Sequence, residues 1–318
     1  MRQFFVGLDI GGTKTEVLIV NTDSSIQSQL KGNTSTTSPK EMVDGVIQTI
    51  YRALDQIEAT PEDVVAIGAG IPGQVHQETG EVRLAANLGL AEYPLGSVLS
   101  SEFGAPVVLE NDVRLAAVGT YDYLRQHETI NHLAYMGIGT GVSVGLVLNG
   151  TLYRGAHGMA GEIGHLVIAD NGVTCNCGQV GCLETVIAGP AIARQAAEAG
   201  LDSTSTMTEL YELAENGNAK AQAIVERVGH FITRAIQSVI MTYDVEKIVL
   251  GGGVTSAGTA LLNTIFSELA LLRKQSELVR VMLPDSKIAL LPSDFNAGTH
   301  GAIRMAQNAV NAFNKRTF

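Results

Sequence analysis

The fold is decided by a stretch of sequence that occurs twice. Residues 6–21 read VGLDIGGTKTEVLIVN, and residues 133–149 read LAYMGIGTGVSVGLVLN. In each stretch an apolar strand runs into a glycine-rich turn, and a second apolar strand follows. Each stretch therefore predicts a β-hairpin with a glycine tip. One hairpin in each half of the chain predicts two duplicated domains whose tips could face one nucleotide, and the alternative is a chance similarity between hairpins.

The rest of the chain alternates between strand-like and helix-like patterns. Strand-like apolar runs lie at Phe4–Asp9, Val64–Gly68, Val107–Leu109, Leu133–Met136 and Ile248–Leu250. Amphipathic segments lie at Pro39–Ala53, Asp112–Gln126, Ala191–Ala199, Ala219–Met241 and Thr299–Phe313. This alternation predicts an α/β architecture with a largely parallel strand order.

Composition excludes several classes of protein. The chain has 318 residues, 45% of them hydrophobic, which is enough for two domains with cores of their own. A net charge of −11 leaves no basic field for nucleic acid or for an anionic membrane. No run of eighteen apolar residues is present, and MRQFFVGLDI reads as a strand instead of a signal peptide. We therefore expect a soluble cytoplasmic protein without a nucleic-acid or membrane partner.

The first glycine loop, Asp9–Thr15, has the composition of a phosphate-binding turn. Its backbone N–H groups at Gly11 and Gly12 can approach phosphate oxygens, and Thr13 and Lys14 can add donors. Asp9 ends the strand and is placed to hold Mg²⁺ through water. The loop is neither a P-loop nor a dinucleotide fingerprint. An ordinary hairpin turn explains this loop equally well when it is considered alone.

Two further glycine loops strengthen the nucleotide interpretation. Gly137–Gly141 contains Gly139, Thr140 and Gly141 at the second hairpin tip. Gly251–Val254, with Gly252 and Gly253, follows the predicted strand Lys247–Leu250. Consecutive glycines at a strand end permit close approach of a flat ligand such as adenine-ribose. Each loop is a weak signal, and three in one chain are a stronger one.

Glu110-Asn111-Asp112 follows the predicted strand Val107–Leu109 and precedes a helix. Asn and Asp are favoured helix N-caps, and the pattern by itself favours that structural role. The functional alternative is that Asp112 accepts a hydroxyl proton while Asn111 binds a neighbouring hydroxyl. Carboxylates at that edge of an open α/β sheet face the usual ligand crevice.

The three cysteines of the chain lie in one short segment. Together with an upstream histidine they complete a tetrahedral ligand set for zinc: His165, Cys175, Cys177 and Cys182. Glu162 and Glu184 bracket this set and are candidate hydroxyl acceptors in the same pocket. A disulfide with a spare thiol is the alternative. It is disfavoured because a C-x-C bridge is strained and nothing indicates an oxidising compartment.

These motifs together resemble the ROK family of bacterial sugar kinases and related repressors. The motifs are DIGGTKT (9–15), GAGIPG (68–73), END (110–112), GIGTGV (137–142), AGEIGH (160–165), CNCGQVGCLE (175–184), GGGV (251–254) and NAGTHGA (296–302). AGEIGH followed by CNCGQVGCLE is the specific part. The glycine loops alone indicate only the broader actin-like ATPase superfamily.

The resemblance implies a two-domain actin-like ATPase, or ribonuclease H-like, fold with an interdomain cleft. The small N-terminal α/β domain would comprise residues 1–115 plus 299–318, and the larger α/β domain with the zinc site would comprise 116–298. The final helix would cross back onto the first domain. ATP and Mg²⁺ would lie across DIGGTKT, GIGTG and GGGV. Members of the family are commonly homodimers or homotetramers.

The resemblance also implies the sugar site. The sugar would lie between Gly73, Asn87, Asn111, Asp112, Glu162, His165 and Glu184. Asp112 would be the base for the phosphorylated hydroxyl, with O6 the first expectation. His165 would both ligate zinc and touch the sugar. The zinc would be structural, because four protein ligands leave no open position. Many relatives have a proline before the sugar-binding Asn and a tryptophan after it, whereas here Ala86 precedes Asn87 and the chain has no Trp.

The leading hypothesis is therefore an ATP-dependent sugar kinase that converts glucose to glucose 6-phosphate. N-acetylmannosamine, N-acetylglucosamine and β-glucosides are alternative substrates, and a polyphosphate donor stays open. A sugar-responsive repressor would need a helix-turn-helix ahead of the first loop, and a strand that begins by Phe4 leaves no room for one. A sugar-binding regulator without turnover is disfavoured because Asp9 and Asp112 are both retained.

Overall fold

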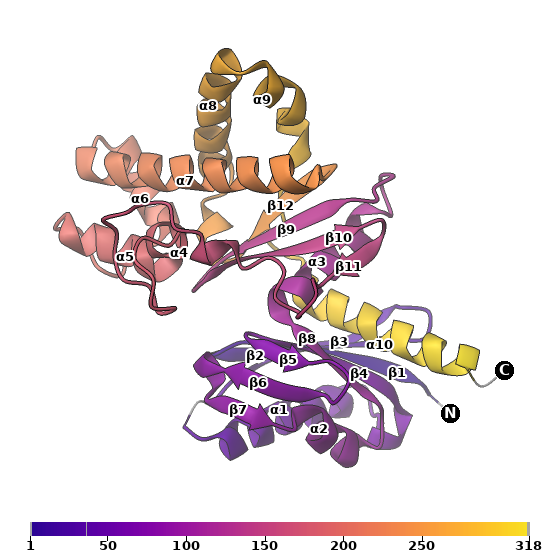
Figure 1. The fold of residues 1–318 in the computed structure, drawn as a ribbon. Helices are drawn as coiled ribbons and strands as arrows, with labels where there is room; N and C mark the ends of the chain where they lie inside the picture. The colour runs from indigo at the N-terminus through magenta and orange to yellow at the C-terminus, as the bar shows by residue number, and fades with distance from the viewer. Residues whose placement is uncertain (1, 36, 317–318) are drawn as a thin grey trace. The chain divides into compact units, whose positions relative to one another are not determined.

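The computed structural model describes residues 2–35 and 37–316, with the side chains of the last helix described as far as residue 312. The chain forms two compact units. Unit 1 comprises Met1–Glu128 and Asn296–Phe318, and unit 2 comprises Thr129–Phe295. Figure 1 shows the elements of both units, coloured along the chain.

The sheet of unit 1 has five strands in the order β3-β2-β1-β4-β8. Their bounds are β1 Phe4–Ile10, β2 Lys14–Asn21, β3 Ile26–Asn33, β4 Val64–Ile71 and β8 Val107–Asn111. Strands β1, β2 and β3 pair antiparallel, whereas β1, β4 and β8 pair parallel. The first predicted hairpin is therefore confirmed as β1 and β2.

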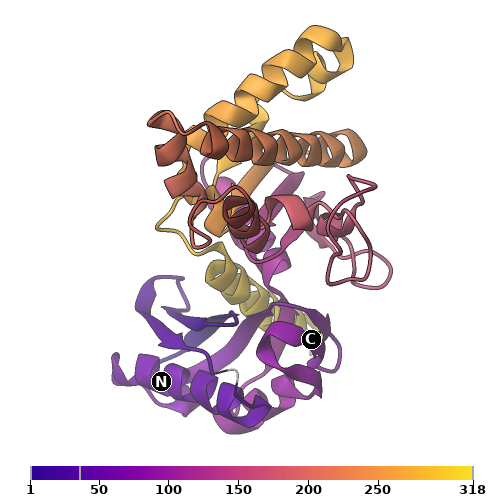
Figure 2. The same ribbon diagram turned by 90° about the vertical axis from the view of Figure 1, so that its left-hand side faces the viewer.

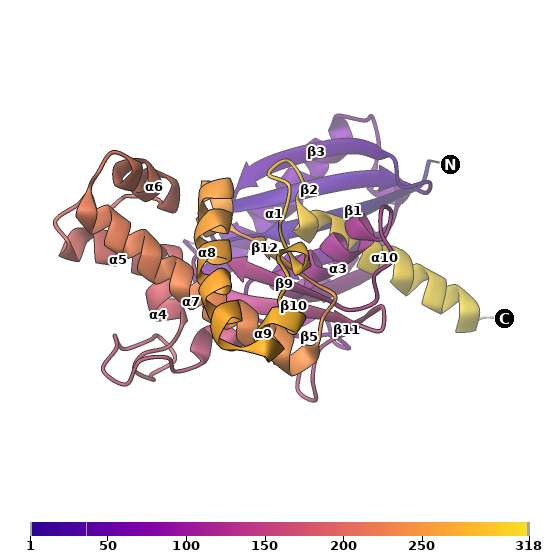
Figure 3. The same ribbon diagram turned by 90° about the horizontal axis from the view of Figure 1, so that it is seen from above.

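The sheet of unit 2 has the same plan, in the order β11-β10-β9-β12-β13. Its strands are β9 Leu133–Ile138, β10 Val142–Leu148, β11 Thr151–Tyr153, β12 Lys247–Gly251 and β13 Ile288–Leu290. Strands β9, β10 and β11 pair antiparallel, and β9, β12 and β13 pair parallel. Figure 3 shows β12, β9, β10 and β11 side by side in this order. The match of order and direction with unit 1 confirms the predicted duplication.

The expectation of a largely parallel strand order was wrong. Each of the two five-stranded sheets is mixed, with two antiparallel and two parallel pairings. The physical reason is the shortness of the glycine turns. A connection of about two to four residues can join only antiparallel neighbours, whereas parallel neighbours need a crossover of a dozen or more residues.

Both faces of the unit 1 sheet are covered by helices. On one face lie α1 (Pro39–Asp55) and α2 (Leu95–Phe103), which bury alternate β1 residues such as Val6 and Leu8. The other face carries α3 (Asp112–Leu124) and α10 (Ala297–Arg316), and there Phe5 packs with Ile303. Figures 1 and 2 show α10 lying along the sheet on the side opposite to α1 and α2.

The unit boundary differs from the predicted one. The expected limit at residue 115 falls inside α3, and the structure keeps α3 whole in unit 1, which continues to Glu128. The reason is that α3 packs along α10, so a cut within α3 would divide one helix pair. The C-terminal segment that returns to unit 1 was predicted to start at residue 299, and in the structure it starts at Asn296. Its predicted end, residue 318, lies outside the described residues.

Helices cover one face of the unit 2 sheet and form a single apolar core with it. They are α4 (Glu184–Ile187), α5 (Gly189–Glu198), α6 (Met207–Glu215), α7 (Ala219–Tyr243), α8 (Thr259–Gln275) and α9 (Glu277–Met282). Every helix predicted from the sequence is present within a few residues. The small sheet of unit 1, formed by β5 (Gln74–His76), β6 (Glu81–Ala85) and β7 (Leu90–Tyr93), was not predicted. Within the described residues, none of the helices has the length and apolar character needed for a membrane span.

Glycines allow α10 to approach its neighbours at backbone contact distance. A Cβ atom on Gly301 would lie 1.9 Å from the Leu115 carbonyl oxygen of α3. A Cβ atom on Gly119 would lie 2.0 Å from the Ala297 oxygen, and one on Gly68 would lie 2.0 Å from the Ala302 oxygen. Any side chain at these positions would push α10 away from α3 and from β4. These contacts explain why the C-terminal helix belongs to unit 1.

We expect Gly301→Ala to destabilise the protein by about 1–3 kcal/mol, because the added methyl group overpacks the contact between α10 and α3. Gly45→Ala is the matched control. Gly45 also lies inside a helix, but its nearest neighbour for a Cβ atom is 3.9 Å away. Alanine should therefore stabilise α1 there by up to about 1 kcal/mol. Urea denaturation measures both values, and equal effects of the two substitutions would refute the packing argument.

Candidate functional site

The strand register of unit 1 brings two predicted site residues to one edge of its sheet. Asp9 of β1 pairs with Gly70 of β4, and Gly70 pairs with Glu110 of β8. A Cβ atom on Gly70 would lie 3.5 Å from the Asp112 Cα atom. The first turn of α3 therefore rests against β4 at the carboxyl end of the parallel strands. Asp9 and Asp112 are consequently presented at the same edge, two strands apart.

Asn111 is the N-cap of α3, as the sequence pattern indicated. Its Oδ1 atom accepts a hydrogen bond of 3.2 Å from the Arg114 N–H group, and its Nδ2 atom donates to the Gly73 carbonyl oxygen at 3.2 Å. Asp112 is the first residue of the helix and is half-buried, and its Oδ1 atom accepts from the Val113 N–H group at 2.9 Å. The structure thus joins Gly73 to Asn111, both predicted to line the sugar site. Gly73 has φ +152° and no room for a Cβ atom.

Glu110 and Arg114, two residues before and after Asp112, form a buried ion pair that was not predicted from the sequence. The Glu110 carboxylate is completely buried, and its Oε1 atom lies 3.4 Å from Arg114 Nη1. The carboxylate also accepts hydrogen bonds from the side chain of Gln77 and from the N–H group of Asn111, the latter at 3.0 Å. The available signal was the i, i+4 spacing of opposite charges, but that spacing is informative only within a helix. Here it spans the junction of β8 and α3.

Asp9 is held by a residue that the sequence analysis did not assign. Its Oδ2 atom accepts a hydrogen bond of 3.3 Å from Asn296 Nδ2. Asn296 Oδ1 in turn accepts from the Thr299 N–H group at 3.1 Å, so that Asn296 caps α10. Burial raises the pKa of Asp9 above its usual value, although the bond from Asn296 opposes the rise. A carboxylate whose ionised form is disfavoured by burial suits a site that is completed by a cation, as expected for Mg²⁺.

The first glycine loop lies beside Asn87. The loop is closed by a hydrogen bond of 2.9 Å from the Gly11 N–H group to the Lys14 carbonyl oxygen. A Cβ atom on Gly12 would lie 3.3 Å from the carbonyl oxygen of Asn87. Asn87 is exposed in a short 3-10 turn, and the Thr13 and Lys14 side chains are also exposed. The structure therefore brings together the predicted phosphate donors and one predicted sugar-binding residue.

In unit 2, the other two glycine loops lie on adjacent strands. Gly137 of β9 pairs with Gly251 of β12, so the loops that follow them begin at the same edge. In the first loop, the Gly139 N–H group donates to the Gly141 carbonyl oxygen at 2.9 Å, leaving Thr140 exposed at the tip. Gly252 has φ +92°, and a Cβ atom there would lie 2.5 Å from the Ile138 oxygen. Gly253 has open space around it, as a close-approaching ligand requires.

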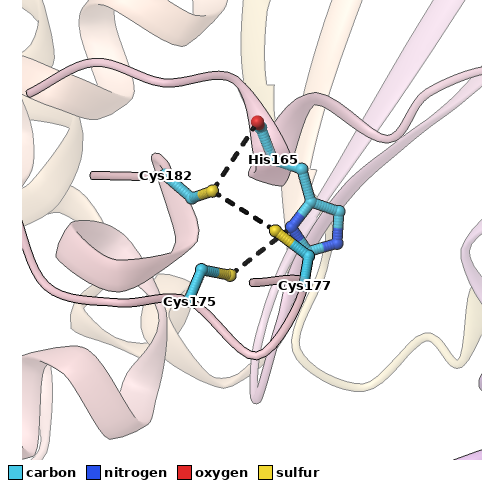
Figure 4. Close-up of side chains that lie close together, drawn as sticks. All are labelled: His165, Cys175, Cys177 and Cys182. Atoms are coloured by element: carbon cyan, nitrogen blue, oxygen red, sulfur yellow. Dashed lines mark hydrogen bonds between the residues drawn. The ribbon is translucent and has the colours of Figure 1, made fainter. Parts of the chain in front are cut away.

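The four predicted metal ligands converge (Figure 4). The ligand atoms of His165, Cys175, Cys177 and Cys182 all lie within 4.8 Å of one another. His165 Nδ1 lies 3.6 Å from Cys175 Sγ, and Cys177 Sγ lies 3.6 Å from Cys182 Sγ. A tetrahedron with zinc–sulfur bonds of about 2.3 Å has edges of about 3.8 Å. The spacing of these atoms therefore fits a tetrahedral zinc ion.

The thiol groups are unbridged and differ in environment. All three cysteines are free, with Cys175 and Cys182 buried and Cys177 exposed. The N–H group of Gln179 lowers the pKa of the Cys177 thiol to about 7. Burial raises the pKa of Cys182 to about 12, and the neighbouring Cys177 and Cys175 add to this effect. A metal ion binds the thiolate form, so it would compensate for the buried charge at Cys182.

Glu162 and Glu184 flank the residues of this cluster in the sequence. Glu162 precedes the 3-10 turn Ile163–His165, and the preceding Gly161 carbonyl oxygen accepts a hydrogen bond of 2.8 Å from Val144 of β10. Glu184 begins α4, and its Oε1 atom lies 3.9 Å from Cys175 Sγ. The structure therefore gathers His165 and Glu184 around the cysteines, with Glu162 three residues before His165.

Comparisons with known proteins agree with this arrangement. The model of the ROK family matches residues 5–309. A glucokinase of Halalkalibacterium halodurans is 32% identical over 278 residues, covering 83% of this chain and 84% of that protein. An N-acetylmannosamine kinase of Haemophilus influenzae is 32% identical over 251 residues, covering 78% of this chain and 80% of that protein.

A solved structure extends the match to the fold. It is a ROK family glucokinase from Streptomyces griseus in complex with glucose and AMPPNP, with a TM-score of 0.77 and 25% identity. The match covers 96% of this chain and 99% of that chain, which confirms the actin-like ATPase fold. Because the family model spans nearly the whole sequence and two relatives exceed 30% identity, the chain belongs to the ROK family.

Proposed function

We propose that this protein transfers the γ-phosphoryl group of ATP to a hexose hydroxyl, with glucose, phosphorylated at O6, as the first candidate substrate. The observation that carries the proposal is the placement of Asp112 and Asp9 at one sheet edge, with the first glycine loop directly after Asp9. One carboxylate can act on the hydroxyl while the other holds the metal that accompanies the phosphates. The similarity to a glucokinase over 83% of the chain supports the same activity.

The nucleotide site in this proposal uses backbone donors from both units. Phosphoryl transfer has a loose transition state, so that positioning and neutralisation of charge matter most. Asp9 would hold Mg²⁺ through water, and the ion would neutralise charge on the phosphates. Donors to the nucleotide would come from Gly11, Gly12, Thr13, Lys14, Gly139, Thr140, Gly141, Gly252 and Gly253.

The sugar site in this proposal is built around Asp112. Its carboxylate would align the attacking hydroxyl and accept its proton, a contribution of about 10²–10⁴-fold in rate. Hydroxyl partners would come from Gly73, Asn87, Asn111, Glu162, His165 and Glu184. Since His165 turns Nδ1 toward the cysteines, its Nε2 atom is the one that would face the sugar. Asn111 keeps its orientation through its bonds to Gly73 and Arg114.

N-acetylmannosamine is the second candidate substrate. The relative from Haemophilus influenzae, at the same 32% identity as the glucokinase, favours it. N-acetylglucosamine and β-glucosides would also need a larger pocket than glucose. The segment from Gly73 to Asn87, which contains β5 and β6, would determine the size of the sugar pocket. Asn87 follows an alanine here, so this segment is where discrimination between sugars should be sought.

The proposal includes a zinc ion bound by His165, Cys175, Cys177 and Cys182. Four protein ligands occupy every position of a tetrahedral ion, so its role would be structural. The segment between residues 166 and 183 has only two isolated β-bridges and no helix or strand of its own. Zinc would therefore supply order that this segment cannot obtain from regular hydrogen bonding.

The proposal also places the enzyme in the cytoplasm as a homodimer or homotetramer. Three large apolar side chains are more than half exposed on α8 and α9, namely Leu271, Leu278 and Val281. Exposed apolar groups of this kind are typical of surfaces that associate. Free thiols and the use of ATP both agree with a reducing compartment.

A panel of sugars tests the proposed activity. With ATP and Mg²⁺, we expect ADP release with glucose or N-acetylmannosamine among glucose, mannose, fructose, N-acetylmannosamine, N-acetylglucosamine and cellobiose. Asp112→Asn should lower kcat by about 10²–10⁴-fold while sugar binding survives, because the amide cannot accept the proton. Asp55→Asn, at an exposed carboxylate at the end of α1, is the matched control. If the wild-type protein releases no ADP with any sugar of the panel, the proposed activity is refuted. If Asp112→Asn keeps the wild-type kcat, the role of Asp112 as the base is refuted.

The metal assignment is tested by Cys177→Ser. Cys177 is exposed, so its replacement removes a ligand with little loss of packing. We expect the zinc content measured by mass spectrometry and the stability to fall together. A loss of about 1 kcal/mol would lower Tm by roughly 2–4 °C. Asn176→Ser, in the same exposed turn, should change neither quantity. Stoichiometric zinc with an unchanged Tm in Cys177→Ser would show that Cys177 is not a ligand.

The raised pKa of Asp9 predicts a stability cost that depends on pH. The folded protein holds the Asp9 proton to higher pH than the unfolded chain does, so stability is lost as pH rises through the folded-state pKa. Asp9→Asn removes this cost. The free energy of unfolding of Asp9→Asn relative to wild type should therefore increase between about pH 4 and pH 8 in magnesium-free urea titrations. An increase that is absent across this range would contradict the interpretation.

Asp23→Asn provides a control of opposite sign. The backbone N–H group of Ser25 lowers the pKa of Asp23, so the wild-type carboxylate stabilises the fold above its unfolded-state pKa. Relative to wild type, this variant should lose stability as pH rises.

A further inference from the structure

Glu184 contacts two functional segments of unit 2 at once. Its Oε2 atom accepts a hydrogen bond of 3.1 Å from the N–H group of Val142, directly after the glycine loop Gly139–Gly141. Its Oε1 atom lies 3.9 Å from Cys175 Sγ in the metal-binding cluster. One carboxylate therefore spans the distance between the cluster and the loop. This geometry is separate from the sugar contact proposed above.

The segment from His165 to Leu183, called the metal-binding segment below, determines where Glu184 lies. The ligand Cys182 is two residues before it, and the Thr185 Oγ1 atom donates to the Cys182 carbonyl oxygen at 2.7 Å. Leu183 donates its N–H group to Leu166 at 2.9 Å. This bond joins the residue after one ligand, Cys182, to the residue after another, His165. Anything that fixes these two ligands therefore also fixes the backbone that carries Glu184.

Glu184 in turn restrains the glycine loop. A Cβ atom on Gly141 would lie 2.7 Å from Glu184 Oε2, so the carboxylate is packed against the loop backbone. The start of the next helix, α5, also holds the loop, because the Gly189 N–H group donates to the Gly139 carbonyl oxygen at 2.8 Å. The loop is thus held at both sides by the segment Glu184–Gly189, which follows directly from the cysteine cluster. Glycines provide no side-chain packing to hold the loop in another way.

The two contacts of the Glu184 carboxylate differ in strength. Cys175 Sγ, a weak donor, lies 3.9 Å from Oε1, whereas the Val142 N–H group donates to Oε2 at 3.1 Å. The bond from Val142 to Oε2 is therefore the stronger hydrogen bond of this carboxylate. Backbone donors to a carboxylate form charge-assisted hydrogen bonds, which are stronger than neutral ones.

We propose that Glu184 is a positioning residue through which occupancy of the metal cluster sets the conformation of the glycine loop Gly139–Gly141. The identity of this loop as a nucleotide-binding loop rests on the proposed function, but its coupling to the cluster does not. Metal release would loosen the segment that carries Glu184, and the loop would lose the acceptor for Val142. A sugar-binding role for Glu184 alone would leave the loop unaffected by the metal.

Hydrogen exchange of the full-length protein, followed by mass spectrometry, tests this coupling. In the zinc-loaded wild type, peptides that cover Gly139–Val142 should exchange slowly. Chelation should raise their exchange by about tenfold, as expected for loss of one charge-assisted hydrogen bond. In zinc-loaded Glu184→Ala the exchange should already be raised, and chelation should add little. Zinc content is measured in every sample so that loss of metal is separated from loss of the side chain.

Two further variants make the outcome decisive. Glu184→Gln retains a carbonyl oxygen that can accept from Val142, so it should keep most of the protection even where Glu184→Ala folds poorly. Asp170→Asn changes an exposed carboxylate of the metal-binding segment and should behave as wild type. The proposal would be overturned if chelation left the hydrogen exchange of the loop peptides unchanged in the wild type. It would also be overturned if chelation raised this exchange equally in the wild type and in Glu184→Ala.

Nucleotide affinity extends the test to function. Calorimetry with AMPPNP should show weaker binding after chelation in wild type and a much smaller change in Glu184→Ala. The exchange experiment needs neither turnover nor ligand. If chelation raises loop exchange in a protein that has no kinase activity, the proposed function is refuted and this inference is supported. If the protein is an active kinase but its loop exchange does not respond to chelation, the inference is refuted and the proposed function stands.

Discussion

The parallel register of β1, β4 and β8 is the constraint on which the unit 1 site depends. In this register Asp9, Gly70 and Glu110 are paired neighbours on three adjacent strands. The absence of a side chain at Gly70 lets the start of α3 approach β4, which presents Asp112 at the same sheet edge as Asp9. Hydrogen bonding fixes this register, since a slip by one residue would turn every side chain of the strand to the opposite face. The separation of the two carboxylates is therefore a property of the sheet and not of flexible loops.

The same edge concentrates buried charge that does not favour folding by itself. Glu110 and Arg114 are both buried, and the desolvation of such a pair offsets much of its attraction. Burial also disfavours ionisation of Asp9. Asn296 links this edge to α10, because it bonds to Asp9 and caps the helix. A stability cost at this edge is consistent with a site prepared for cationic and polar ligands, and the close packing of α10 on α3 and β4 offsets it.

Much of the fold could be predicted from local patterns. The hairpins, the main helices and the duplication follow from apolar periodicity and glycine turns, which are local signals. The mixed strand order could have been read from the shortness of the turns, but alternation with helices suggested parallel order instead. The clustering of His165 with the cysteines was predictable because three thiols in eight residues leave few other roles. Glu110, Arg114 and Asn296 were not, since their partners come from separate elements and their importance arises only from burial.

The metal-binding segment shows why a structural ion suits this position. The residues between His165 and Leu183 form no helix or strand, and several of their apolar side chains, including Leu166 and Val180, are exposed. Such a segment buries too little apolar surface to offset the entropy of ordering it. Yet it must hold Glu184 against the glycine loop within hydrogen-bonding distance. Ligand bonds to a metal ion would provide that order without a hydrophobic core, so the surfaces around the loop would stay open to ligands. The geometry of the loop would then depend on the ion.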